Sequence, residues 1–366
     1  MLNPDYQKRE SIAVSSIKKA IPQKLKQDML PICKGLFAEI YENKVFPNHY
    51  MACAIDGVGT KILLADALEI YDTVGIDLVA MSANDLVTLA GTSPFLFLDY
   101  LAIQEKIKEK AGDIIKGIVN GLKQCETGDI LNNHIHINLG KGETASVDEL
   151  ISSFKPGFGF DLAGAMLGFI EKDKLNIKIS IGDKIIALKS SGPHSNGYTD
   201  LRLKLLNGDF ETRPEFKKNY KGKHSLNDSF EGTTIGKALL EPTKIYVRTM
   251  TEISRKFKVV GINNTGYGLK NLNRIKGNFE FLIDNPIEPQ PIFQLMQKES
   301  GFTDEQMYKK FNMGQGFFII AKPEDTDEIL KIAKKDSPQI VGEVKKASKE
   351  KTTLIKDNKK IVFEGY

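Results

Sequence analysis

Apolar segments alternate with polar loops along the chain, and the spacing of their residues distinguishes strands from helices. The runs Ala52–Ile55, Phe95–Ile103 and Asp161–Ile170 are nearly continuous, which predicts buried strands. Between them, Tyr71–Gly91 and Asp113–Gln124 carry apolar residues at helical spacing and predict helices. Strands that alternate with helices predict an α/β (α+β) domain built on a sheet.

The second half of the chain repeats this alternation after a charged stretch, Glu171–Asp173. The pattern predicts a strand at Lys184–Leu188, a helix at Thr199–Leu206, a helix from Glu241 to about Arg255, and a strand at Phe317–Ala321. The C-terminal residues predict a hairpin. We place a domain boundary at the charged stretch, which gives an N-terminal domain of residues 1–170 and a C-terminal domain of residues 171–366.

Composition narrows the class of protein. The chain has 366 residues, enough for two domains, and a formal net charge of only +4. Because lysines are thinly spread and arginines do not cluster, we expect no binding to nucleic acid. The three cysteines lack the spacing of a metal site. The sequence shows neither an apolar signal segment nor a run of membrane-spanning length, so we expect a cytoplasmic protein without a membrane partner.

A glycine-rich turn follows the first predicted strand, in the sequence Asp56–Lys61. Gly57 and Gly59 permit a tight backbone turn, and Thr60 and Lys61 add a hydroxyl and an ammonium group. The spacing is too short for a P-loop and lacks the third glycine of a dinucleotide fingerprint. One interpretation is an ordinary turn. The other is that the backbone amides and the Lys61 ammonium group bind phosphate while the Asp56 carboxylate binds Mg²⁺.

Acidic groups elsewhere support the phosphate and Mg²⁺ interpretation. Asp77, Asn84 and Asp85 share one edge of an apolar helix and need partners there, such as a metal ion or the Lys61 ammonium. Helix capping or a solvated edge is the alternative, which we favour for Asp77 but not for Asp85. A further strand is predicted at His134–Leu139, and the loop after it brings Glu143 to a second strand end.

Three polar loops in the second half are candidates for substrate binding. Ser190–Tyr198 places hydroxyls, an amide and glycines before a helix, which favours an anion pocket, and His194 offers proton transfer at neutral pH. A turn with an incidental histidine is the alternative. Asn263–Leu269 and Phe311–Gly316 are further glycine-containing polar loops.

These motifs together resemble the aminoimidazole ribonucleotide (AIR) synthetase family, also called phosphoribosylformylglycinamidine cyclo-ligases. The Asp-Gly-x-Gly-Thr-Lys element is shared by a wider superfamily of ATP-dependent enzymes, whereas Ser-Gly-Pro-His-Ser-Asn-Gly-Tyr and Phe-Asn-Met-Gly are more specific. The matching segments occur in the family's order: Asp56–Lys61, Asp72–Leu86, Phe97–Tyr100, Asp161–Gly168, Ser190–Tyr198, Pro242–Val247 and Phe311–Gly316.

The resemblance implies a two-domain fold, with an N-terminal mixed-sheet domain that pairs in a homodimer and a C-terminal α/β domain. It implies that ATP binds through the first domain and across the dimer interface. ATP would phosphorylate the formyl amide oxygen of formylglycinamidine ribonucleotide, and ring closure would then yield aminoimidazole ribonucleotide. Two alternatives stay open: a sibling kinase or synthetase of the same superfamily, and a nucleotide-binding protein without turnover.

Site residues follow from the resemblance position by position. Asp56, Asp85 and Glu143 would hold Mg²⁺, and the ATP phosphates would meet Gly57, Gly59, Thr60 and Lys61. His194, Asp56 and Lys61 would be catalytic. The residues expected to bind the ribonucleotide are Ser191, Gly192, Ser195, Asn196, Gly197, Asn263, Thr265, Gly266 and Asn312.

The chain departs from the family pattern in three places. Ser146 replaces the second acid of the loop that carries Glu143, and that loop also contains Lys141. Asn263 replaces a histidine, and Tyr267 replaces a glycine. Only Gly35 remains of a glycine-rich segment before the first core strand. These changes fall in substrate and ATP loops and support the alternative without turnover.

Overall fold

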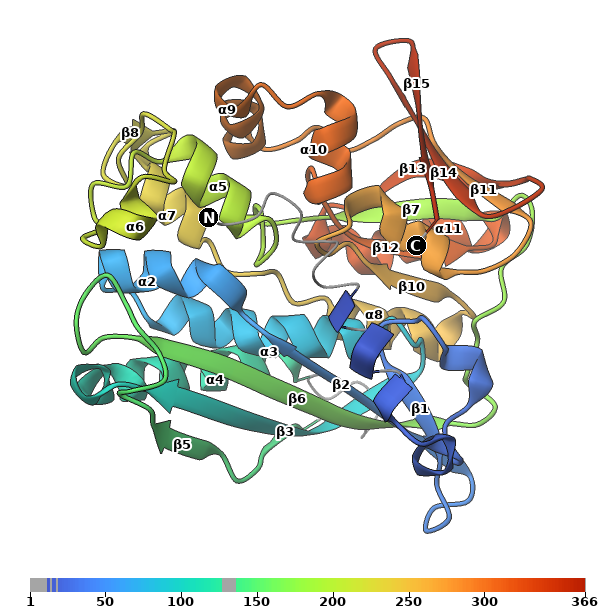
Figure 1. The fold of residues 1–366 in the computed structure, drawn as a ribbon. Coiled ribbons are helices and arrows are strands. Elements are labelled where there is room, and N and C mark those ends of the chain that lie inside the picture. Colours follow the sequence, from blue (N-terminus) through green and yellow to red (C-terminus); the bar gives the residue numbers. More distant parts are fainter. Residues whose placement is uncertain (1–11, 14, 18, 127–135, 366) are drawn as a thin grey trace.

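Two sheets, one in each half of the chain, form the framework of the protein. The computed structural model describes residues 12–126 and 136–365, apart from residues 14 and 18. Figure 1 shows the N-terminal sheet in the lower part of the view, with the strands of the C-terminal half above it. None of the helices among these residues has both the length and the apolar character needed to span a bilayer.

The N-terminal sheet has six strands in the order β1-β2-β6-β3-β4, and β5 also pairs with β3. The central strand β6 pairs antiparallel with both β2 and β3, whereas β4 and β5 run parallel to β3. The sheet is therefore mixed, as predicted. Its strands are β1 (Glu39–Glu42), β2 (His49–Gly57), β3 (Thr92–Ile103), β4 (Asn138–Leu139), β5 (Glu143–Ser146) and β6 (Phe160–Glu171).

Helices cover one face of this sheet, where alternate side chains such as Ala54, Phe97 and Met166 are buried. The long helix α3 packs closely on α4 because glycines remove side chains from the contact. A Cβ atom on Gly75 would lie 2.2 Å from the Ile114 carbonyl oxygen. The helices of this half are α2 (Ile62–Leu68), α3 (Asp72–Val87) and α4 (Ala111–Cys125).

The C-terminal sheet has seven strands in the order β10-β12-β7-β13-β11-β14-β15. They are β7 (Lys184–Lys189), β10 (Val260–Asn263), β11 (Phe279–Ile283), β12 (Gln315–Ala321), β13 (Gln339–Lys346), β14 (Lys351–Lys356) and β15 (Lys359–Glu364). A separate small hairpin joins β8 (Ser229–Phe230) and β9 (Thr233–Thr234). The helices are α5 (Tyr198–Leu205), α6 (Pro214–Lys217), α7 (Ile235–Leu240), α8 (Val247–Lys256), α9 (Pro291–Ser300), α10 (Asp304–Lys310) and α11 (Thr326–Ile332).

Two sequence predictions need correction or remain partial. The helix predicted from Glu241 begins only at Val247, because the backbone before it bonds to side chains of α3 and of the glycine turn before α2. The strand predicted at His134–Leu139 is described only as the short β4, and residues 134 and 135 lie outside the described part of the chain.

Candidate active site

The glycine-rich turn closes the end of β2 as the sequence suggests. The Asp56 carboxylate accepts a 2.7 Å hydrogen bond from the N–H of Gly57. Gly59 has a φ of 68°, a conformation that favours glycine, and both it and Thr60 are exposed. The turn therefore presents backbone and a hydroxyl to solvent, a suitable surface for an anion.

Lys61 does not extend toward solvent from this turn. Its side chain is fully buried, and its ammonium group lies 2.8 Å from Asp77 Oδ2, 3.0 Å from the His194 carbonyl oxygen and 2.7 Å from the Glu241 carbonyl oxygen. An ammonium group has three N–H donors, so these protein acceptors use all of them. In this arrangement, Lys61 joins the N-terminal turn to two segments of the C-terminal half instead of facing a phosphate.

Asp77 is the acidic partner at this junction. It is 0% exposed, and its Oδ1 atom accepts hydrogen bonds from the backbone N–H and the hydroxyl of Thr243, at 2.7 and 2.6 Å. Our preference for a capping or solvated role for Asp77 is therefore wrong, because the domain contact buries this carboxylate. The expectation that Lys61 serves as partner to this helix edge is confirmed.

Asp85 lies between the two halves of the molecule, next to Asp56 and Asn263. The Asn263 amide donates a 2.8 Å hydrogen bond to Asp85 Oδ1. Burial, together with the nearby negative charge of Asp56, raises the pKa of Asp85 to about 7 against the opposing effects of Asn263 and Arg274. Two carboxylates that disfavour each other's charge form a site that a cation would stabilise.

Glu143 does not join this pair within one chain, which corrects the predicted convergence of three acids. Glu143 is in register with Tyr100 on β3, whereas Asp56 is in register with Gly164 on β6. Three strand spacings therefore separate the two acids, roughly 14 Å. Among the described residues, no group of three or more histidine, cysteine or acidic side chains could hold a metal ion.

His194 is held in an environment that opposes its protonation. It is only 2% exposed, with a left-handed φ of 60°, and its Nε2 accepts from the Ser191 N–H at 3.4 Å. Burial, with the charges of Lys61 and Lys244, lowers its pKa to about 3. The imidazole is therefore neutral at pH 7, which does not fit the predicted proton transfer at neutral pH.

The three polar loops of the second half meet, but several of their side chains bind one another. Asn312 accepts from the Ser190 hydroxyl at 3.0 Å and donates to the Gly192 carbonyl oxygen at 2.9 Å. The Ser191 hydroxyl donates to the Pro242 carbonyl oxygen at 2.5 Å, and the Ser195 and Thr243 hydroxyls lie 3.2 Å apart. The predicted substrate residues Ser191, Ser195 and Asn312 therefore hold the loops together through contacts within the protein.

Other predicted substrate residues remain available to a ligand. Asn196, Gly197, Thr265 and Gly266 are all partly exposed. A Cβ atom on Gly266 would lie 3.5 Å from Asn196 Oδ1, so the two loops face each other directly. This narrow pair of loops, rather than the buried Asn312, is the part of the predicted substrate site that a ribonucleotide could reach.

Sequence reasoning missed Arg274, whose charge acts on Asp85. Its guanidinium donates to the carbonyl oxygens of Gly35 and Leu36, at 2.9 and 3.3 Å, and lies 4.1 Å from the centre of the Phe37 ring. Arg274 thereby holds the divergent N-terminal segment beside the site. In the sequence, the signal that could have identified Arg274 as a site residue was its position at the end of a helical segment that follows a polar glycine loop.

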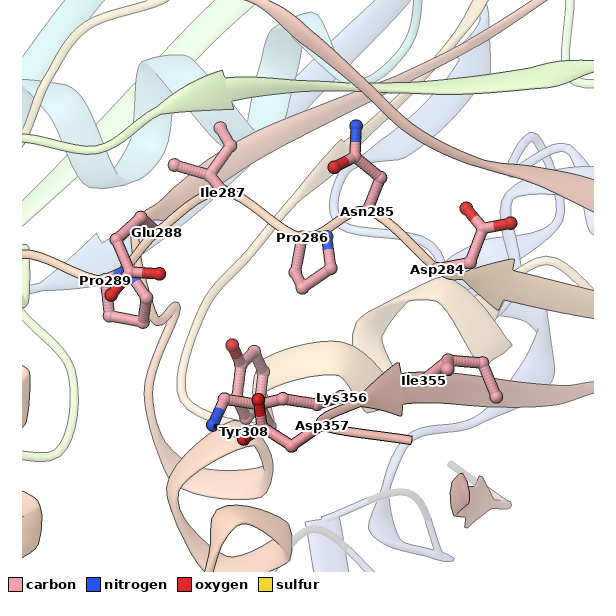
Figure 2. Close-up of a pocket in the computed structure, with 10 residues that line it drawn as sticks. All are labelled: Asp284, Asn285, Pro286, Ile287, Glu288, Pro289, Tyr308, Ile355, Lys356 and Asp357. Atoms are coloured by element: carbon pink, nitrogen blue, oxygen red, sulfur yellow. Dashed lines mark hydrogen bonds and ion pairs between the residues drawn. The ribbon is translucent and has the colours of Figure 1, made fainter. Parts of the chain in front are cut away.

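Two cavities deserve comparison. One, which we call the α2 pocket, has a volume of about 360 Å³ and is lined by Gly59, Thr60, Ile62, Leu63, Asp66, Ile151, Ser152, Ser153, Phe158, Gly159, Phe160 and Asp161. The other has about 240 Å³ and lies between the Asp284–Pro289 segment and the side chains of Tyr308, Lys356 and Asp357 (Figure 2). Only the α2 pocket contains predicted site residues.

Known protein families match both halves of the chain. The family model "AIR synthase related protein, N-terminal domain" matches residues 40–170, and the corresponding C-terminal domain model matches residues 180–355. The chain belongs to the AIR synthase family. Among its curated relatives, the phosphoribosylformylglycinamidine cyclo-ligase of Methanococcus maripaludis is 35% identical over 347 residues, 90% of this chain and 89% of the relative. The enzyme of that name from Pyrococcus furiosus is 38% identical over 290 residues, 78% of this chain and 76% of the relative.

Solved structures share the fold of this AIR synthase family member. The hydrogenase maturation protein HypE in complex with ATP has a TM-score of 0.56 at 13% identity, covering 86% of this chain and 85% of HypE. AaThiL complexed with AMPPCP and TMP has a TM-score of 0.57 at 14% identity, covering 95% and 93%. The predicted AIR synthetase-like α/β fold is therefore confirmed.

Proposed function

We propose that this AIR synthase family protein uses ATP to cyclise formylglycinamidine ribonucleotide to aminoimidazole ribonucleotide. The observation that carries the proposal is the pair Asp56 and Asp85, set between the domains beside an exposed glycine turn. The family relationship supports the substrate, because the relatives that span most of the chain are named as cyclo-ligases for this compound.

Asp56 and Asp85 fit a magnesium ion. Mg²⁺ is usually held by one or two carboxylates, with water and substrate phosphates filling the other positions, so a third protein acid is not required. Burial and the nearby charge of Asp56 raise the pKa of Asp85, so a divalent cation bound beside it would stabilise its ionised form. Bound there, the ion would neutralise charge on the ATP phosphates during phosphoryl transfer.

The chain's own residues would position the reactants. The backbone of Gly57 and Gly59 and the Thr60 hydroxyl would contact the ATP phosphates, and the loops of Asn196 and Thr265 would hold the ribonucleotide. The γ-phosphoryl group passes to the formyl amide oxygen, an amidine nitrogen attacks the activated carbon, and inorganic phosphate leaves with that oxygen. Such chemistry depends on alignment more than on a nucleophilic side chain.

Lys61 and His194 have positioning roles in this proposal. Lys61 ties the phosphate turn to the carbonyl oxygen of His194, so the two candidate loops share one buried ammonium. His194 in turn accepts the Ser191 N–H and shapes the substrate loop as a neutral ring. Neither needs to exchange a proton with the substrate.

A homodimer accounts for the exposed face of the N-terminal sheet. The face opposite the helices carries alternate apolar residues of β2, β6 and β3, and its Ile55 and Tyr100 are 73% and 42% exposed. Patches of this kind mark interaction sites. Because Glu143 is in register with Tyr100, a second copy packed there would bring Glu143 toward the partner's nucleotide. This explains how Glu143 could serve an active site that it does not reach within its own chain.

Product formation tests the proposed function. Purified protein with Mg²⁺, ATP and formylglycinamidine ribonucleotide should yield aminoimidazole ribonucleotide and one phosphate per ATP. Asp85→Asn should reduce the rate at least a hundredfold, whereas Asp113→Asn, in the first turn of α4 with its side chain 43% exposed, should not change it. ATP hydrolysis that does not depend on this ribonucleotide, or product formation unaffected by Asp85→Asn, would contradict the proposal.

A further inference from the structure

We propose that a cavity of the C-terminal half binds a linear aliphatic diamine through its ammonium groups. The cavity, which we call the Tyr308 pocket, has a volume of about 240 Å³ and lies between the Asp284–Pro289 segment, α10 and the turn that joins β14 to β15 (Figure 2). None of the residues that line it belongs to the predicted active site, so this inference goes beyond the proposed function and does not depend on it.

A buried hydroxyl group without a partner points to a ligand in this pocket. Tyr308 lines the cavity and is only 1% exposed, and its Oη atom has no hydrogen-bond partner among the described residues. Figure 2 shows the Tyr308 ring beside the Asp284–Pro289 segment, with its hydroxyl end toward that segment. Buried polar groups in proteins are usually hydrogen-bonded, because an unsatisfied one destabilises the folded state. A polar ligand atom beside Oη would remove this cost.

Acidic side chains give the pocket a negative charge. Asp284, Glu288 and Asp357 line it, together with one basic residue, Lys356. The Lys356 ammonium is already shared between two carboxylates, 2.9 Å from Asp357 and 3.4 Å from Asp304. In the described part of the chain, no basic side chain lies within 4 Å of the carboxylate oxygens of Asp284 or Glu288. The pocket therefore repels an anion and attracts a cation.

The same charges act on the unpartnered hydroxyl group. Burial, together with the charges of Asp304, Glu288 and Asp357, raises the pKa of Tyr308. The phenol is therefore protonated at pH 7, and its oxygen can accept a hydrogen bond from an ammonium N–H. Carboxylates that oppose negative charge on this oxygen favour positive charge beside it. A cationic hydrogen-bond donor is thus the group that suits this end of the pocket.

The arrangement of the acids indicates a ligand with two cationic ends. Figure 2 shows Asp284 and Glu288 at opposite ends of their segment, with the apolar side chains of Pro286 and Ile287 between them. One ammonium group of a diamine can bind Tyr308 and Glu288 while the other lies near Asp284. Its methylene groups then cover the apolar residues. Because no three metal-ligating side chains converge among the described residues, an organic cation fits better than a metal ion.

Both walls of the pocket are fixed before a ligand arrives. On one wall, the N–H groups of Asp284 and Asn285 both donate to the Val341 carbonyl oxygen at 3.1 Å. On the other wall, Asp357 has a φ of 50° in the two-residue turn between β14 and β15, as such tight turns require. Walls held in this way spare the ligand part of the entropic cost of ordering them.

Two single-residue variants test the assignment. Tyr308→Phe removes only the unpartnered hydroxyl group, so the variant should fold without losing stability. Glu288→Gln removes one negative charge at the same end of the pocket while keeping the size of the side chain. Glu305→Gln is the matched control, because Glu305 is exposed in the first turn of α10, the helix of Tyr308, and does not line the pocket.

Calorimetric titration of the full-length protein would compare 1,4-diaminobutane with 1,4-butanediol, its uncharged analogue. We expect the natural protein to bind the diamine but not the diol, and each pocket variant to bind the diamine at least about threefold more weakly. Glu305→Gln should bind it as the natural protein does. The diamine should also raise the melting temperature of the natural protein more than that of Tyr308→Phe.

Four results would overturn the inference: no diamine binding at millimolar concentration, equal binding of the diol, unchanged affinity in either pocket variant, or an equal loss in Glu305→Gln. Cyclo-ligase activity is measured without the diamine, so none of these results bears on the proposed function. Absence of that activity would, in turn, leave the expected diamine binding unchanged.

Discussion

Lys61 is a charged side chain that the fold buries completely, with three oxygen atoms in place of its hydration shell. Its sequence context, after two glycines and a threonine, is typical of a phosphate-binding lysine. The sequence could not show that the Asp77 carboxylate and the Glu241 carbonyl oxygen would reach it, since 180 positions separate Lys61 from Glu241. The sequence therefore predicted that the charged group of Lys61 needs partners, but it could not predict which groups these would be.

Removing the Lys61 ammonium should destabilise the protein. Lys61→Met leaves the Asp77 carboxylate buried without its counter-charge, which typically costs about 3–5 kcal/mol of unfolding free energy. Urea unfolding measures this loss, and the double variant Lys61→Met with Asp77→Leu should recover part of it. A variant that keeps its stability but no longer binds ATP would instead support a phosphate contact for Lys61.

His194 should make stability depend on pH. Its pKa of about 3 in the folded protein lies below the value of about 6.5 for the unfolded chain. Between these values, the unfolded chain binds the extra proton, so stability is complete above pH 6.5 and falls as pH decreases toward 3.

Between pH 7 and pH 5, we expect the natural protein to lose about 2 kcal/mol more unfolding free energy than the His194→Asn variant. One titrating group changes this free energy by at most roughly 1.4 kcal/mol per pH unit. Asparagine tolerates the left-handed backbone of this position, so the variant changes little else. Equal pH dependence of both proteins would show that His194 is not held neutral.

The core elements were largely predictable from their patterns. Continuous apolar runs identified β2, β3 and β6, and helical spacing identified α3 and α4, because these elements are buried on at least one side. The segment before α8 was misassigned as helix, since its backbone groups bond to Asp77 and Asn84, which are far away in the sequence. Local patterns predict elements that pack, but not backbone that binds distant side chains.

The contact of α3 with α4 should tolerate no added methyl group. A Cβ atom on Gly117 would lie 2.0 Å from the Asp72 carbonyl oxygen, whereas one on Gly112, in the same helix, meets nothing within 4 Å. We expect Gly117→Ala to destabilise the protein by about 1–3 kcal/mol and Gly112→Ala to stabilise it by up to about 1 kcal/mol. Thermal unfolding of both variants checks this difference, and equal shifts would rule out the close helix contact.

At the scale of the whole molecule, the sequence predicted the two-domain family fold but not the arrangement of its site. Asp56 and Asp85 come together because α3 crosses the sheet between the domains, as their electrostatic coupling shows. Glu143 could be matched by motif, yet the strand order places it several strands away on the same sheet. Topology and any second copy, rather than residue spacing, decide which acids share a site.

The exposed sheet face should hold two copies together. Ile55→Arg places a charge in the centre of this face, so we expect it to convert the dimer to a monomer in light-scattering measurements. Val45→Arg is the control, because Val45 is equally exposed, at 77%, but lies in a loop off the sheet. A natural protein that is monomeric at micromolar concentration would contradict the proposed dimer and the role of Glu143 within it.

In the proposed reaction ATP activates the formyl amide oxygen of the substrate, so the fate of that oxygen reports on this step. Formylglycinamidine ribonucleotide labelled with ¹⁸O at the formyl oxygen would be converted with Mg²⁺ and unlabelled ATP, and the released phosphate analysed by mass spectrometry. We expect one ¹⁸O atom in each phosphate formed with product. Phosphate without the label, released together with aminoimidazole ribonucleotide, would contradict it.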